Sequence, residues 1–100
     1  MEEENGSVSR EMPKYKCTKI VHALKIADVV FDRDLADKEN RETDGTAFIT
    51  PEDTGFAVFK VDAGYVSKHN PQAGGYYVVY EDGYKSWSPA EAFEKGYTRI

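Results

Sequence analysis

Few side chains in this sequence have the types and the spacing that catalysis needs. Cys17 and His22 could form a thiolate–imidazole pair for nucleophilic attack. Their odd separation along the chain places them on opposite faces of a strand, so we expect Cys17 to be a buried thiol that packs as a small apolar residue. His69 is expected to be solvated near a helix end. The sequence has neither a Gly-x-x-x-x-Gly-Lys phosphate loop nor a Gly-x-Ser-x-Gly elbow, and we predict that the chain is not an enzyme.

Acidic side chains gather between residues 32 and 44, where they could suggest a calcium site. A calcium loop of the EF-hand type needs alternating ligands, a central glycine and a final glutamate, and Asp32-Arg33-Asp34-Leu35-Ala36 departs from that pattern. No set of cysteines and histidines has the spacing of a zinc site. We therefore expect no metal and no cofactor.

Aromatic side chains are concentrated near the C-terminus, where residues 76–97 hold seven of the 13 in the chain. Their rings can stack and their hydroxyl groups can donate hydrogen bonds, which suits a flat base, a peptide or a protein partner. The candidate binding surface consists of Tyr77, Tyr80, Tyr84, Lys85, Tyr97 and Arg99. The alternative is that these tyrosines only cover a core of Val78, Trp87 and Phe93, since strands favour aromatic residues anyway.

The elements that position these aromatic residues are predicted from turn and cap residues. Residues 76–81 are expected to form a strand, and Asp82-Gly83 a two-residue hairpin turn that pairs Val78 with Trp87 on the returning strand. Ser88-Pro89-Ala90-Glu91 has the order of a capping box, with Ser88 as N-cap and Pro89 in the first helical position. The helix should run to Lys95 and stop at Gly96.

The first two thirds of the chain give a weaker pattern. Residues 15–31 favour strands by their branched side chains, but neither alternate set is cleanly apolar, so we expect two strands with a bend near Ala23. Nine of the 13 residues between 32 and 44 are charged, which predicts a solvated loop. Short strands are expected at 46–50 and 56–61, followed by a short helix over 62–69 that begins at Asp62.

Composition limits the class of protein. A chain of 100 residues with 40% hydrophobic content predicts one domain, here 13–100 with a charged loop at 32–45, after a disordered tail at 1–12. No apolar run reaches the roughly 18 residues of a membrane span, and the start does not resemble a signal peptide. The single cysteine fits a reducing compartment, so we expect a cytoplasmic protein. A net charge of −5 argues against binding to duplex DNA.

The predicted fold class is α+β. We expect a small, mainly antiparallel sheet, either open or barrel-like, with a C-terminal β-hairpin that leads into a short capped helix. The segment 75–89, which reads GYYVVYEDGYKSWSP, continues to Phe93 and Tyr97 and resembles the C-terminal signature of a family of small, mostly uncharacterised proteins encoded by bacteriophages and prophages. Residues 12–17 and 23–27 resemble the beginning of such proteins.

The resemblance implies a non-enzymatic phage protein acting in a bacterial host cell, without implying any catalytic residue. The first hypothesis is a binding protein that inhibits or modulates a host protein, such as a defence component. The second is a sponge that sequesters a nucleotide signal at the interface of a homo-oligomer, with tyrosines on the base and Lys85 or Arg99 facing phosphate. The third is a self-associating structural or regulatory phage protein without a ligand. These hypotheses remain open on the sequence alone.

Overall fold

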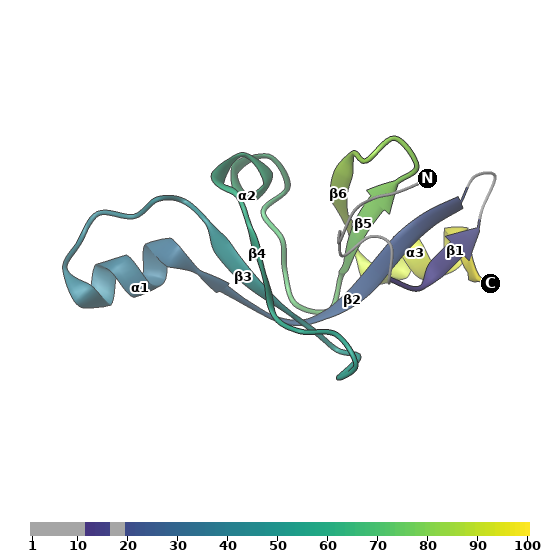
Figure 1. The fold of residues 1–100 in the computed structure, drawn as a ribbon, viewed down its shortest axis with the longest axis horizontal. Coiled ribbons are helices and arrows are strands. Elements are labelled where there is room, and N and C mark those ends of the chain that lie inside the picture. Colours follow the sequence, from purple (N-terminus) through teal and green to yellow (C-terminus); the bar gives the residue numbers. More distant parts are fainter. Residues whose placement is uncertain (1–11, 17–19) are drawn as a thin grey trace.

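The computed structural model describes residues 12–16 and 20–100, which form an α+β fold with a mainly antiparallel sheet (Figure 1). The elements in chain order are β1 (Lys14–Lys16), β2 (Ile20–Phe31), α1 (Asp32–Glu39), β3 (Ala47–Pro51), β4 (Phe59–Val61), α2 (Ala63–His69), β5 (Tyr76–Tyr80), β6 (Lys85–Ser88), α3 (Ala90–Gly96) and β7 (Thr98–Arg99). This confirms the predicted fold class. Cys17 and the tail up to residue 11 lie outside the described residues, whereas Met12, which we assigned to the tail, is buried in the core.

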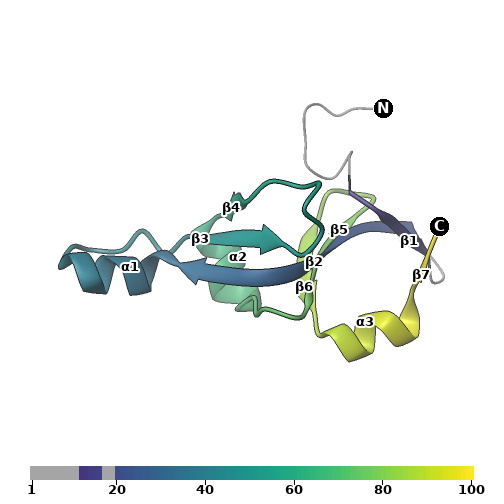
Figure 2. The ribbon, with the colours of Figure 1, turned by 90° about the horizontal axis from the view of Figure 1, so that it is seen from below.

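The long strand β2 holds the two halves of the sheet together. Its first half pairs with β1 and β5, and its second half pairs with β3, which pairs in turn with β4 (Figure 2). The predicted break near Ala23 is wrong, because Ala23 pairs with Val78 inside a continuous strand. The irregularity lies further on, where Ile26 faces Pro51 and Asp28 faces Thr50, so that Ala27 is an unmatched bulge residue.

The bulge explains the mixed apolar pattern of this strand. Before it, Leu24 and Ile26 point into the larger core cluster, and after it Val29 and Phe31 do. One extra residue changes which alternate set faces the core, and a single strand can therefore serve one core along its whole length. Ile26 and Val29 are three residues apart and would face opposite sides in a regular strand, but here they lie on the same side of the sheet.

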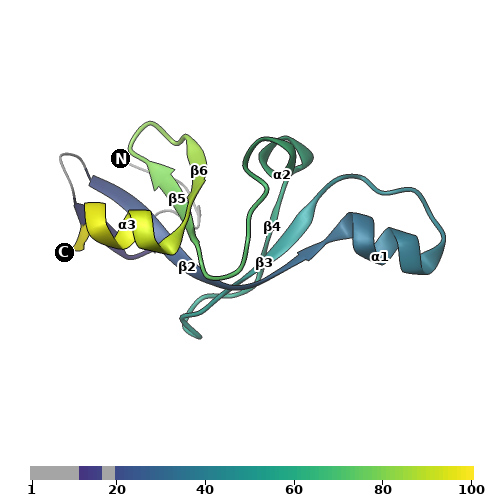
Figure 3. The ribbon, with the colours of Figure 1, turned by 180° about the vertical axis from the view of Figure 1, so that it is seen from behind.

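The two faces of the sheet are covered by different helices. The larger cluster lies on the side of α2 and includes Tyr65 and Val66 from that helix. The smaller cluster lies on the opposite face of β2 and β5 and is centred on Phe93 of α3 (Figure 3). Asp62 caps the N-terminus of α2 as predicted, and its carboxylate accepts a hydrogen bond from the Tyr65 amide at 2.8 Å.

The sheet does not close into a barrel. Helix α2 lies between β4 and β6 (Figure 1), and the Tyr65 hydroxyl donates a hydrogen bond of 2.8 Å to the Ser86 carbonyl of β6. In the described residues β4 pairs with β3 and β6 pairs with β5, and these two end strands do not pair with each other. The barrel-like option that we considered is therefore wrong.

The C-terminal hairpin and helix are confirmed, but with a different register. Tyr77, and not Val78, pairs with Trp87. The Tyr80 amide donates to the Tyr84 carbonyl, so the loop has three residues instead of two and ends at Gly83, whose φ is +90°. Ser88 belongs to β6, and Pro89 is the N-cap without a side-chain hydrogen bond, so the predicted capping box is wrong.

The charged segment after β2 is a helix, not the solvated loop that we expected. Helix α1 ends at Asn40, which has a φ of +56°, and projects from one end of the molecule (Figure 1). Its first residue, Asp32, is the one buried charged side chain among the described residues. The Asp32 carboxylate accepts hydrogen bonds from Arg41 at 2.9 and 3.2 Å, from the Thr43 hydroxyl at 2.8 Å and from the Asp44 amide at 3.2 Å. These contacts fold the segment back onto its own start.

Acid is expected to destabilise the segment from Asp32 to Asp44 through the Asp32 carboxylate. Hydrogen bonds from Arg41 and Thr43 hold the pKa of Asp32 well below its usual range, so the stabilisation is present above pH ~4 and is lost as the pH falls from there. In urea titrations between pH 5 and 2, the free energy of unfolding of Asp32→Asn should fall less steeply with decreasing pH than that of the wild type. The difference between the two slopes should approach the uptake of about one proton on unfolding. Asp37→Asn is the matched control, because it removes an exposed carboxylate from the same helix. Equal slopes for all three proteins would contradict this role of Asp32.

Candidate functional site

The six residues of the predicted binding surface do not lie on one surface. Tyr77 is buried in β5, where its ring packs edge-on against Phe59, with a centroid distance of 4.8 Å. Burial raises the pKa of Tyr77 to about 12. The expectation that Tyr77 is exposed for a partner is wrong, because both faces of β5 are covered: Tyr77 lies in the larger core cluster and its neighbours Tyr76 and Val78 lie in the smaller one.

Tyr80, Tyr84 and Lys85 lie together at the tip of the β5–β6 hairpin. The rings of Tyr80 and Tyr84 are nearly parallel, with centroids 5.9 Å apart. The Tyr84 hydroxyl lies 3.3 Å from Nε2 of His69 at the end of α2, and the Lys68 ammonium lies 5.0 Å from the Tyr84 ring centroid. The tip is therefore packed against α2 by polar and cation–π contacts.

A shallow hollow of about 350 Å³ lies between this tip and α2, lined by Tyr65, Lys68, His69, Tyr84 and Lys85 among others. Burial is the main cause that lowers the pKa of His69, and the nearby Lys68 lowers it further, which favours the neutral imidazole. Exposed lysines beside aromatic rings can contact an acidic or aromatic group of a partner. Whether this hollow serves as a binding site stays a prediction.

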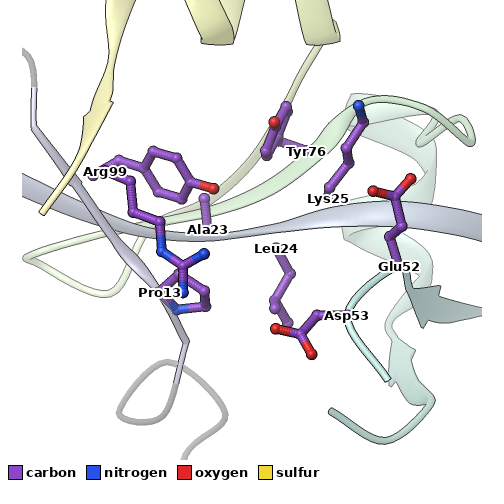
Figure 4. A pocket seen from close by; sticks show the side chains of 9 residues that line it. Pro13, Ala23, Leu24, Lys25, Glu52, Asp53, Tyr76 and Arg99 are labelled. Carbon is purple, nitrogen blue, oxygen red and sulfur yellow. The ribbon is translucent and has the colours of Figure 1, made fainter. Parts of the chain in front are cut away.

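Tyr97 and Arg99 lie on another part of the molecule, near α3 and β7. Tyr97 stacks on Phe93 with a centroid distance of 4.5 Å and an interplanar angle of 14°. Arg99 lines a separate hollow of about 220 Å³, where Lys25 faces Glu52 and Asp53 approaches from the loop after β3 (Figure 4). The mixed charges of this hollow select no single type of ligand.

In this second hollow, Lys25 forms an ion pair with a glutamate of α3. Its ammonium lies 3.4 Å from Oε2 of Glu94, which also accepts a hydrogen bond of 2.7 Å from the Tyr76 hydroxyl. The Tyr76 and Lys25 hydrogen bonds lower the pKa of Glu94, so the carboxylate is charged at neutral pH. This network links α3 to the sheet, which is a structural role for these side chains.

The structure shows a surface that sequence reasoning missed. We define the outer face as Asp28, Val30, Phe48, Thr50, Val58 and Lys60, which lie on β2, β3 and β4 or, for Val58, directly before β4, on the side away from α2. Val30, Phe48 and Val58 are 37%, 39% and 54% exposed, and they are three of the five exposed large apolar residues in the described part of the chain. These residues are far apart in sequence, and only the strand register brings them together.

The described residues, 12–16 and 20–100, contain neither a metal-binding cluster nor a helix that could span a membrane. Within these ranges, no three histidine, cysteine, aspartate or glutamate side chains come together in a way that could hold a metal ion. No helix in the same ranges is long and apolar enough to cross a membrane.

Comparison with known proteins gives one informative structural similarity. No protein-family model matches the sequence, and no significant match is found among curated proteins. The chain is similar to the solution NMR structure of the monomeric form of the phage L decoration protein, with a TM-score of 0.62 and 25% sequence identity. The similarity covers 94% of this chain but 63% of the decoration protein, so the chain spans less than two thirds of that protein's length.

Proposed function

We propose that this chain is a structural phage protein that attaches to a capsid shell and associates with copies of itself. The observation that carries this proposal is the similarity to the phage L decoration protein over 94% of the chain. It favours the third hypothesis from the sequence over the host-protein inhibitor that we placed first. It gives no support to a nucleotide sponge.

The surface of the molecule is compatible with this role. A protein that coats a shell needs an exposed contact area and no enclosed ligand cavity, and exposed apolar groups that gather on one face mark such contact areas. Here the outer face provides an apolar area, and the two hollows described above are shallow and open. The projecting helix α1 adds a charged contact element at one end (Figure 1).

The proposal is tested by sedimentation with capsids. Purified protein is mixed with particles of the phage that encodes it, the particles are pelleted, and the bound protein is measured over a range of concentrations. We expect binding that saturates at a fixed number of copies per particle, because a repeated shell offers a fixed number of equivalent sites. An acidic protein of similar mass is the control and should stay in the supernatant. A chain that also stays in the supernatant at ~10 μM, far above the Kd of a specific protein complex, would refute the capsid role.

A further inference from the structure

We infer that the outer face is the surface through which two copies of this chain associate, with the two copies related by a two-fold axis. The inference rests on the proposed function, since it assigns a surface to the self-association proposed above. Val30, Phe48 and Lys60 form one row of neighbouring residues across the three strands. Asp28 and Thr50 form the next row, which Val58 extends because it lies two residues before Lys60.

This face lacks the cover that the rest of the same sheet surface has. Beside β5, this side of β2 presents Val21 and Ala23, and α3 covers both through Phe93. Beyond the bulge, no described element lies over the paired part of β2 and β3, as Figure 2 shows from this side, and Val30 and Phe48 in these strands are exposed. A solvated sheet face normally carries polar side chains, so exposed valines and a phenylalanine indicate a partner.

The charges of the outer face make it complementary to itself. Asp28 and Lys60 occupy opposite corners, on the first and the third strand and in different rows. Strand spacings place their Cα atoms roughly 12 Å apart, too far for direct pairing within one copy. A two-fold axis along the other diagonal, from Val30 to Val58, brings Asp28 of each copy over Lys60 of the second copy. The strands then cross steeply, as in orthogonal sheet packing, with Phe48 between the charged corners.

The size of the face determines how strong this association can be. Six side chains on three short strands form an interface at the small end of specific complexes, and we expect a Kd on the order of 100 μM. Copies bound at neighbouring sites on a shell experience an effective concentration of about a millimolar, which is enough to populate the contact there. A weak pair in solution therefore suffices for a structural role on a particle.

The test is sedimentation velocity of the full chain from ~10 μM to ~1 mM, a range that brackets the expected Kd. The wild type should shift from monomer to dimer. Phe48→Ser and Val58→Ser should each weaken the association at least tenfold, whereas Tyr84→Ser, at a similarly exposed aromatic residue elsewhere, should not. A wild-type chain that is still monomeric at ~1 mM overturns the inference. So does an equal effect of Phe48→Ser and Tyr84→Ser, with folding of each variant checked by circular dichroism.

Charge reversal tests the two-fold arrangement itself. Asp28→Lys and Lys60→Asp should each weaken the dimer, and the double variant should restore it, because the two side chains meet only between copies. Lys60 also lies 3.9 Å from Asp44 in its own chain, so Asp44→Asn is the control and should leave the dimer unchanged. A double variant no better than the single variants overturns the proposed geometry. These outcomes are independent of capsid binding, so a monomer that still pellets with particles refutes the interface and leaves the capsid role standing.

Discussion

Replacement of Phe93 by alanine should lower the free energy of unfolding by about 3–5 kcal/mol. The ring is 1% exposed and lies at the centre of an aromatic stack, with the Tyr76 and Tyr97 centroids at 4.2 and 4.5 Å on nearly parallel planes. Tyr15 packs edge-on against it at 4.8 Å. The variant would lose these contacts and leave a cavity between α3 and the sheet, which one short helix cannot close. Since domains of this size have only about 5–15 kcal/mol of stability, α3 should detach or the chain should unfold.

Urea titration followed by tryptophan fluorescence measures this effect. The midpoint for Phe93→Ala should fall by at least about 1 M relative to the wild type. Phe48→Ala is the matched control, because it deletes the same ring at a position that is 39% exposed, and it should change stability by no more than about 0.5 kcal/mol in dilute protein. Similar losses for the two variants would show that the aromatic stack is not the main support of α3.

The hairpin and the following helix could be predicted because local chemistry determines them. Asp82-Gly83 requires a turn, and the residues after Trp87 favour a helix start. The register could not be predicted, because both a two-residue and a three-residue loop fit the same residues and differ only in where Gly83 lies. The predicted surface was wrong for another reason: both faces of β5 are covered, which buries Tyr77, whereas Tyr84 beyond the end of β5 stays exposed.

Helix α1 could not be predicted because its stability comes from contacts beyond its own length. Its eight residues are mostly charged and bury little, and a short isolated helix of this composition is unstable in water. The Asp32 carboxylate is bound by Arg41, Thr43 and the Asp44 amide, all beyond the end of the helix. A pattern of charges shows that such a segment is solvated, but it does not show which charges meet.

Strand β2 is irregular, as its sequence pattern indicated, but the irregularity lies at another residue than predicted. The mixed alternation of residues 20–31 correctly indicated that the strand is not regular, but a bend and a bulge have the same effect on the pattern. Pairing with β3 places the irregularity at Ala27, four residues after the predicted position. The outer face depends on the same pairing, since Val30, Phe48 and Val58 become neighbours only in this register.

Two single-residue deletions in β2 should therefore have opposite outcomes. Deletion of Ala27 removes the unmatched residue and leaves every other pair in place, with Asp28 opposite Thr50 and Val29 opposite Ile49, so this variant should still fold. Deletion of Val29 also removes the bulge, but a regular strand then places Asp28 opposite Ile49, which is fully buried. A carboxylate without a partner in this core costs several kcal/mol, so this variant should be unfolded at neutral pH.

Circular dichroism and amide NMR spectra compare the two proteins directly. If both fold equally well, the register of β2 against β3 does not decide which side chains enter the core; if neither folds, the bulge at Ala27 is itself required for the curvature that joins the two halves of the sheet.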